Sequence, residues 1–385
     1  MRYFLAKRRT RFISLVSLIS ILGVAVGVTA LMVVLAVMSG FDTDLKDKII
    51  GANAHIVVEK DYGISDYLSL ADKLKDMPHV EAVAPFINGQ AMLIHRQNVY
   101  GIGVRGIEPE KEFRVTKIGQ YLKEGSSTIG KEEIIIGKVL SERLKVKLGD
   151  SISLISPFDG HSYTFRISGI FNSGMYDYDA NLVFINLGRA QEIFGLEGVV
   201  SGIGIKIDRV ELAKKIRQEI NKNIGYEYFV LTWMDTNRNL FSALKLEKTV
   251  MFIILTLIVV VAAFNIVSTL IMLVMEKTKD IGILKAIGAT SKSVELIFSW
   301  EGMIIGIFGT FLGVFGGLGL CYLLKNYEFI KLPQDIYYIE RLPVKIERLD
   351  SVLVIFFAIL ISYLATLYPA RQASRLNPVE ALRYE

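Results

Sequence analysis

The order of apolar and polar stretches divides this chain into four candidate membrane spans and one large region between the first two. Residues 12–41 form an apolar run of thirty residues without a charged side chain. Further apolar runs lie at Val250–Met275, Ile297–Leu324 and Val352–Tyr368. A helix needs roughly 17–25 apolar residues to cross a bilayer, whereas the apolar part of a secretory signal has only about 7–15. We therefore predict four transmembrane helices.

An even number of spans places both chain ends on the same side of the membrane. Lys7, Arg8, Arg9 and Arg11 directly precede the first run, and clustered positive charge favours the cytoplasmic side. We therefore expect a cytoplasmic N-terminus at residues 1–11, a first span at 12–41, an outer region at 42–248, a second span at 249–275, a cytoplasmic helix at 276–296, a third span at 297–324, an outer loop at 325–350, a fourth span at 351–368 and a cytoplasmic C-terminus at 369–385.

The outer region alternates short β-rich segments with helical ones, which is typical of an α+β domain. The predicted fold class is thus an α-helical membrane protein with four transmembrane helices and an α+β extracytoplasmic domain inserted between helices one and two. Helical periodicity at Asp42–Ile50 and Asn237–Lys248 predicts that the first two spans continue outward as stalks. Strands are predicted at His55–Val58, Ala91–Ile94, Tyr100–Val104, Ile134–Ile136, Ser151–Ile155, Tyr163–Ile170, Leu182–Ile185, Ile203–Ile207 and Tyr226–Leu231, and helices at Asp66–Lys75, Lys138–Leu144, Gly188–Phe194 and Val210–Asn221.

The segment between the second and third spans, Glu276–Phe298, is too charged to lie in lipid. Ile281, Leu284 and either Ile287 or Gly288 recur at three- to four-residue spacing, which predicts a short amphipathic helix. Its apolar stripe needs a partner surface, either the lipid interface or a cytoplasmic protein. The position between two spans favours the protein.

Span three contains the series Gly309, Gly313 and Gly317, and span one contains Gly23 and Gly27. Glycines at four-residue spacing allow close approach of two helices. The sequence leaves open whether this stripe packs within the chain or forms a dimer interface. Asn265 lies deep in span two and Glu301 near the cytoplasmic end of span three; for Asn265 the alternatives are a functional site and an interhelical hydrogen bond.

Composition and motifs offer little support for catalysis. The net charge of +5 over 385 residues is modest and is not the footprint of a nucleic-acid-binding protein. Gly125–Glu132 lacks the hydroxyl residue of a nucleotide-binding loop, and Gly101–Gly106 matches a dinucleotide pattern but is better explained as a bent strand. The four histidines have no metal-ligand spacing, and the single Cys321 excludes an intrachain disulfide. We predict that the chain is not an enzyme and binds no metal or cofactor.

Three segments closely resemble the LolC/LolE permeases of the lipoprotein-releasing system, within the wider superfamily of MacB-like and FtsX-like permeases. They are VMSGFDTDLKDKIIG at Val37–Gly51, VVAAFNIVSTLIMLVMEKTKDIGILKAIGAT at Val260–Thr290 and LATLYPARQASRLNPVEALRYE at Leu364–Glu385. The likeness runs nearly end to end and includes APF and RGIEP in the outer region. It implies a multi-pass protein of the bacterial inner membrane whose large domain lies in the periplasm.

The resemblance also implies partners. A LolD-type ATPase homodimer would bind ATP and magnesium on the cytoplasmic face, beside a second permease copy or a paralogue. The cargo would be outer-membrane lipoproteins, passed to a LolA-type carrier. In this family the segment matching Glu276–Ser293 couples to the ATPase, which gives the candidates Glu276, Lys279, Asp280, Ile281, Leu284, Lys285 and Ile287. Spans one and two line the lipid-anchor cavity, which gives Val24, Val28, Leu31, Leu35, Phe252, Leu255, Val259 and Phe264.

One loop departs from the family. LolC-type chains carry a longer proline-containing hook that captures the carrier, whereas this chain has only SPFDGHS at Ser156–Ser162. Pro157 and Phe158 are the remaining candidates for a carrier contact, and assignment to LolC, to LolE or to a homodimer serving both roles stays open. The rival functions are a MacB-like efflux permease and an FtsX-like regulator that transmits ATPase cycles to cell-wall hydrolases.

Overall fold

The computed structural model describes residues 11–96, 98–327 and 342–377, except for the side chains of residues 11–16 and Leu255. The chain divides into two compact units. The first, called here the helical unit, comprises Met1–Asp42, Leu244–Ile330 and Leu342–Glu385, and the second, the mixed unit, is centred on Thr43–Ala243. Each unit is described by itself.

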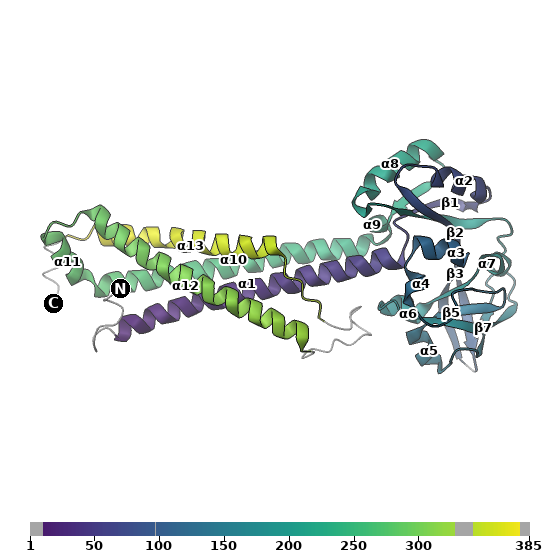
Figure 1. The fold of residues 1–385 in the computed structure, drawn as a ribbon, viewed down its shortest axis with the longest axis horizontal. Helices are drawn as coiled ribbons and strands as arrows, with labels where there is room; N and C mark the ends of the chain where they lie inside the picture. The colour runs from purple at the N-terminus through teal and green to yellow at the C-terminus, as the bar shows by residue number, and fades with distance from the viewer. Residues whose placement is uncertain (1–10, 97, 328–341, 378–385) are drawn as a thin grey trace. The chain divides into compact units, whose positions relative to one another are not determined.

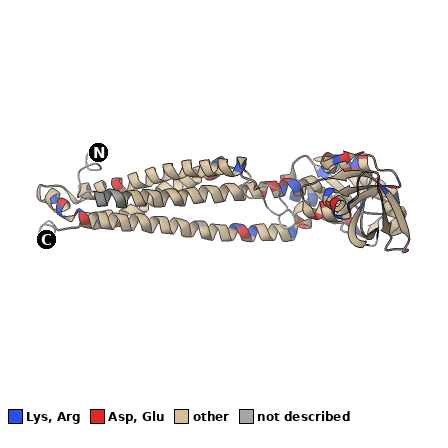
Figure 2. Ribbon diagram, turned by 90° about the horizontal axis from the view of Figure 1, so that it is seen from below, with Lys and Arg blue, Asp and Glu red and all other residues tan. Residues whose placement is uncertain are grey.

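The helical unit is built from long apolar helices and one short helix (Figure 1). Four helices of the described chain are long and apolar enough to cross a membrane. Figure 2 shows long stretches of these helices without charged residues. Because α1 runs to Ala52 and α10 begins at Arg238, the predicted helical continuation beyond spans one and two is confirmed. The helices are α1 (Arg11–Ala52), α10 (Arg238–Glu276), α11 (Thr278–Ala286), α12 (Ser291–Asn326) and α13 (Arg348–Ser374).

The glycine stripe of α12 packs against α1 of the same chain. A Cβ atom added at Gly309, Gly313 or Gly317 would lie 2.7, 2.6 and 2.7 Å from the Cβ atoms of Val24, Val28 and Met32, respectively. Real Cβ atoms do not approach so closely, so only glycine permits this spacing of the two helices. Of the two alternatives left open by the sequence, the structure confirms packing within the chain.

Polar side chains also join α1 to α10. Ser20 Oγ donates a hydrogen bond to Asn265 Oδ1 at 3.3 Å, and it also hydrogen-bonds Thr269 Oγ1. Gly23 leaves the space that the Asn265 side chain occupies. An amide without a hydrogen-bond partner is energetically unfavourable among apolar helices. Of the two alternatives for Asn265, the structure therefore supports the interhelical hydrogen bond.

The mixed unit contains one sheet of ten strands in the order β10-β1-β9-β2-β3-β8-β5-β7-β4, with β6 paired to β2 and β7. Most neighbours are antiparallel; β3–β8 and β5–β7 are parallel. The strands are β1 (Ile56–Ile64), β2 (Val80–His95), β3 (Asn98–Ile107), β4 (Leu122–Gly125), β5 (Glu133–Gly137), β6 (Ser151–Ile155), β7 (Ser162–Phe171), β8 (Leu182–Asn186), β9 (Val200–Ile207) and β10 (Phe229–Thr232).

Short helices connect these strands and cover the sheet (Figure 1). All nine predicted strands overlap an observed one, but β2 is four times longer than Ala91–Ile94 because it continues back through Pro85 to Val80. Gly101–Gly106 lies inside β3, as its interpretation as a strand requires, and Gly125–Glu132 leads into β5. The helices are α2 (Tyr67–Lys75), α3 (Pro109–Val115), α4 (Ile118–Tyr121), α5 (Lys138–Leu144), α6 (Tyr176–Asn181), α7 (Leu187–Phe194), η2 (Val210–Leu212), α8 (Ala213–Ile224) and α9 (Trp233–Thr236).

An ion pair is buried between β3 and α3. Arg105 Nη2 lies 3.1 Å from Glu112 Oε1, and the guanidinium stacks on the Phe86 ring at 4.5 Å. Burial raises the pKa of Glu112, and the nearby Arg105 opposes this shift. A charge removed from water in this way is tolerated only with its partner in place. Arg105, the first residue of the RGIEP segment, is therefore explained by the folding of the mixed unit.

His55, which directly precedes β1, is buried and is expected to make the stability of the mixed unit depend on pH. Burial lowers the pKa of His55 below its ordinary value of 6.5, against the effect of its backbone hydrogen bond with Ile207. Below pH 6.5 the unfolded chain therefore binds the proton more readily than the folded chain, and stability falls with acid. We predict that the unfolding midpoint falls between pH 7 and 5 by more in the wild type than in His55→Gln. Equal slopes for the two proteins would contradict this.

Candidate functional site

An apolar groove of about 450 Å³ lies between α1, α10 and α13 of the helical unit. Only Asp350, Thr256 and Ser362 carry polar side chains among its lining residues. Both hydroxyls donate to carbonyls of their own helices, Thr256 to Phe252 and Ser362 to Ala358, so the groove presents an almost wholly apolar wall. The lining residues are Val24, Gly27, Val28, Leu31 and Leu35 of α1; Phe252, Thr256, Ile258, Val259, Ala262 and Ile266 of α10; and Asp350, Leu353, Val354, Phe357, Ala358, Ile361 and Ser362 of α13.

The groove brings together most of the residues expected to line a cavity. Val24, Val28, Leu31, Leu35, Phe252 and Val259 all face it. Phe264 does not line it and is 67% exposed on another face of α10, and the side chain of Leu255 lies outside the described part of the structure. The whole α13 wall was missed, because the apolar run Val352–Tyr368 has no polar face that would reveal its orientation.

One end of the groove is held together by polar contacts. Ser39 Oγ donates a hydrogen bond to Asp350 Oδ2 at 3.2 Å, which joins α1 to the first turn of α13. The backbone nitrogen of Lys345 donates to the carbonyl of Ala36 at 2.9 Å, and Gly40 leaves room for Pro343 beside it. The segment before α13 therefore packs directly against α1.

The short helix α11 is anchored to the rest of the helical unit by two of its predicted partner-binding residues. Ile281 is only 2% exposed and packs into an apolar cluster formed by α10, α12 and α13. The Lys285 Nζ atom donates hydrogen bonds to the carbonyls of Ser374 at 2.6 Å and Leu376 at 2.8 Å. Ile281 and Lys285 thus fix α11 to the C-terminal end of α13, and the expectation that Ile281 shares an outward stripe with Leu284 is wrong.

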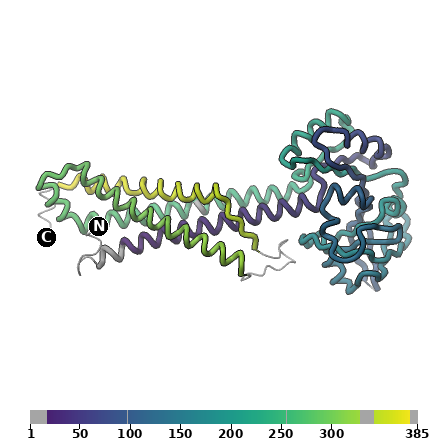
Figure 3. Tube along the Cα trace, viewed as in Figure 1, coloured from purple at the N-terminus to yellow at the C-terminus, as the bar shows by residue number. Residues whose placement is uncertain are grey.

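The opposite side of α11 is open. Leu284 is 46% and Ile287 80% exposed, and Ile283 is exposed beside them. Glu276, Lys279 and Asp280 are exposed as well, with Asp280 paired to Lys277 at 2.8 Å. Helix α11 is shorter than predicted because Gly288 adopts a φ of +106°, which ends the helix, and Thr290 then caps α12. The trace in Figure 3 follows this turn from α10 through α11 to α12.

In the mixed unit, the loop between β6 and β7 is a tight turn. Ser156 Oγ donates to the carbonyl of Ile193 at 2.6 Å and accepts from the backbone nitrogen of Phe158 at 3.1 Å. Hydrogen bonds from Ser156 and His161 lower the pKa of Asp159 to about 2. The predicted carrier-contact residue Phe158 is 70% exposed at this turn, beside Pro157.

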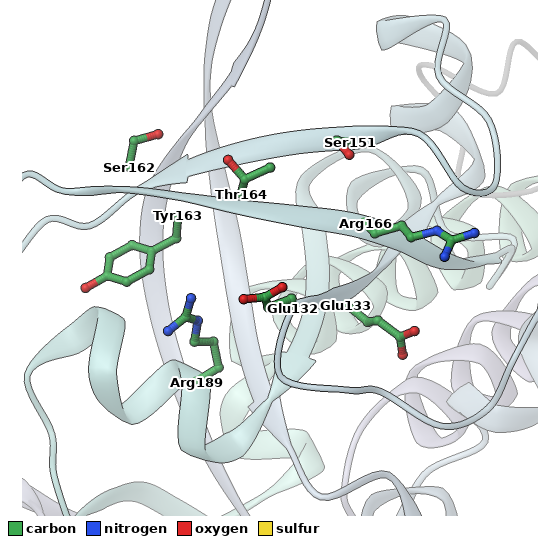
Figure 4. Close-up of a pocket in the computed structure, with 8 residues that line it drawn as sticks. All are labelled: Glu132, Glu133, Ser151, Ser162, Tyr163, Thr164, Arg166 and Arg189. Atoms are coloured by element: carbon green, nitrogen blue, oxygen red, sulfur yellow. The ribbon is translucent and has the colours of Figure 1, made fainter.

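A second, polar pocket of about 500 Å³ lies on the mixed unit. Figure 4 shows its lining residues, which are Glu132, Glu133, Ser151, Ser162, Tyr163, Thr164, Arg166 and Arg189. Arg189 stacks on the Tyr163 ring at 4.8 Å and pairs with Glu192 at 2.5 Å. Within the described residues, no group of three or more His, Cys, Asp or Glu side chains could hold a metal ion.

Comparison with known proteins agrees with this architecture. The MacB-like periplasmic core domain family matches residues 17–223, and the FtsX-like permease C-terminal family matches residues 252–378. Lipoprotein-releasing system transmembrane protein LolC of Xylella fastidiosa is 37% identical over 100% of this chain and 98% of its own length. LolC of Neisseria meningitidis is 33% identical over the same shares, and LolE of Haemophilus influenzae is 28% identical over 99% and 97%. The chain therefore belongs to the LolC/LolE family of lipoprotein-releasing system transmembrane proteins.

Proposed function

We propose that this chain is the permease subunit of an ABC transporter that extracts outer-membrane lipoproteins from the inner membrane and releases them to a periplasmic carrier. The four long helices span the inner membrane, with α11 and both chain ends in the cytoplasm and the mixed unit in the periplasm. A separate LolD-type ATPase homodimer binds ATP and magnesium, and a second permease copy or paralogue completes the complex. The observation that carries this proposal is the apolar groove, because the family's cargo is an acylated protein.

The energetics of extraction explain why a groove is needed. A lipoprotein anchor has on the order of 45 methylenes, and at about 0.8 kcal/mol per CH₂ its full exposure to water costs roughly 30–40 kcal/mol. The ATPase cycle cannot supply that amount in one step. The acyl chains must therefore pass from lipid into another apolar environment, and the side chains of the groove provide one. An FtsX-like regulator moves no substrate, so that rival function does not require an apolar groove.

Helix α11 supplies the connection to the ATPase. Its exposed residues Ile283, Leu284 and Ile287 form the docking surface, while Ile281 and Lys285 hold α11 against the rest of the helical unit. Because Lys285 binds the end of α13, and α13 also lines the groove, a displacement of α11 is passed to the groove wall. Phe158 and Pro157 remain the candidates for contact with the carrier.

We predict that the double substitution Leu284→Asp and Ile287→Asp uncouples the transporter. Burying each of these side chains in a partner is worth about 1.5–3 kcal/mol, so two buried charges weaken ATPase docking by at least about a hundredfold. Lipoprotein release from reconstituted vesicles and co-purification of the ATPase should both be lost. The thermal unfolding of the permease should not change, because both side chains are exposed.

Leu68→Asp is the matched control, since Leu68 is 58% exposed in the first turn of α2, outside the coupling segment, and a carboxylate is favourable there. It should leave release unchanged. Release at the wild-type rate by the double variant would contradict the docking surface. In contrast, Ile281→Asp would disturb folding and could not test docking.

A further inference from the structure

The groove is polar at the Asp350 end and apolar along the rest of its lining. This distribution is complementary to an amphiphile, which has a polar head and an apolar chain. Along α1 its lining extends from Val24 to Leu35, and along α13 from Asp350 to Ser362. At 1.5 Å per residue these stretches are ~16 Å and ~18 Å long. Half of a hydrocarbon core of ≈30 Å is about 15 Å, so the groove is as deep as one leaflet. A volume of about 450 Å³ lies toward the low end for small-molecule sites, which suits one chain better than three.

The carboxylate of Asp350 lies at the end of this groove without a matching charge. Its Oδ2 accepts from Ser39, and neither oxygen pairs with a lysine or arginine among the described residues. Of the two cations close to Asp350 in sequence, Lys345 lies 3.3 Å from Glu347 and Arg348 is exposed. A half-buried carboxylate beside apolar walls is stabilised by a cation that brings its own donors.

We propose that the groove takes one acyl chain of an amphiphile whose head carries an ammonium group, and that Asp350 is the residue that recognises that group. This inference rests on the proposed function, which places the Asp350 end of the groove at the outer leaflet. Two sources offer this chemistry: an aminophospholipid of the membrane, and the free α-amino group of a diacylated lipoprotein. In both, the chain lies along Leu353, Val354 and Phe357 while the ammonium group meets the carboxylate.

A purely structural role for Asp350 is the competing explanation. An acidic residue in the first turn of a helix is stabilised by the helix dipole, and Asp350 also joins α13 to α1 through Ser39. Such a role predicts effects on stability and none on the choice of head group. The test must therefore compare head groups in one protein.

The experiment places a benzoylphenylalanine photo-crosslinker at Phe357 in the full-length permease, purified with its ATPase into nanodiscs. Four acyl-labelled probes are compared: phosphatidylethanolamine, phosphatidylglycerol, a diacylglyceryl-cysteine peptide with a free α-amine, and the same peptide N-acetylated. We expect one amine-bearing probe, or both, to crosslink about tenfold more than its counterpart without an ammonium group, the size expected of one charge-assisted contact. A preference for phosphatidylethanolamine over phosphatidylglycerol would identify a membrane lipid as the ligand. A preference for the free-amine peptide over its N-acetylated form would identify the lipoprotein.

Three variants test whether Asp350 causes this preference. Asp350→Asn retains an oxygen that can accept from Ser39 and should abolish the preference, whereas Asp350→Glu keeps the charge and should retain it. Ser39→Ala removes the hydrogen bond to Asp350 but keeps its carboxylate, so it should also retain the preference. Equal crosslinking of all probes in the wild type, or an unchanged preference in Asp350→Asn, would overturn the inference but leave the groove as an acyl site. Absence of any acyl crosslink at Phe357 would overturn the role of the groove itself.

Discussion

Replacing Gly313 by leucine is expected to abolish lipoprotein release. A Cβ atom at this position would lie 2.6 Å from the Cβ of Val28 and 2.7 Å from the backbone oxygen of Ala25, so α12 and α1 must separate. Overpacking of this kind costs about 1–3 kcal/mol. Because Val28 contacts Gly313 on one side and lines the groove on the other, the displaced α1 would narrow the groove.

Gly319→Leu provides the matched control in the same helix, since a Cβ at Gly319 meets nothing within 4 Å. Release from reconstituted vesicles and the thermal unfolding midpoint should be measured for both variants. Gly313→Leu should lose release and unfold at a lower temperature, and Gly319→Leu should match the wild type. Equal behaviour of the two variants would contradict the packing of α12 on α1.

The second large effect is expected in the mixed unit, where Arg105→Met should destabilise the fold by about 3–5 kcal/mol. The substitution leaves Glu112, which is fully buried, without its partner and so raises the pKa of that carboxyl further. It also removes the cation that stacks on Phe86. Hydrogen exchange of the full-length protein should show loss of protection in β2, β3 and α3.

Two companion variants test the cause. Adding Glu112→Leu to Arg105→Met removes the uncompensated charge and should recover most of the lost stability. Lys206→Met removes an exposed ion pair in which Lys206 Nζ lies 2.9 Å from Glu81 Oε2. This variant should lose at most about 1 kcal/mol of stability. A loss of less than about 1 kcal/mol in Arg105→Met would show that the buried pair does not stabilise the unit.

The sequence was most informative where the apolar pattern is long and uninterrupted. The apolar runs predicted the long helices, and continuous helical periodicity predicted their extension to Ala52 in α1 and from Arg238 in α10. Segments rich in β-branched and aromatic residues located the strands of the mixed unit but not their ends. Strand β2 was predicted too short because Glu81 and Pro85 interrupt the pattern, although its pairing with β9 tolerates both.

The groove and the anchoring of α11 depend on contacts between distant segments. Spans that are apolar on every side do not reveal which face packs and which lines a cavity, so Phe264 was expected in a site that it does not reach. Ile281 and Leu284 share a three-residue spacing, yet one faces the cluster around Ala370 and the other faces outward. The bonds from Lys285 to carbonyls 89 and 91 residues away could not be foreseen from the segment itself.

The central claim is that the groove shelters an acyl chain while the cargo leaves the membrane. The most direct measurement places a photo-crosslinker at Val259, which lines the groove, or at Phe264, which lies outside it on the same helix, in the complex loaded with an acyl-labelled lipoprotein. The account predicts strong labelling from Val259, weak labelling from Phe264, and loss of the Val259 product after ATP is added. Equal labelling from both positions, or a Val259 product that persists through ATP hydrolysis and release, would contradict it.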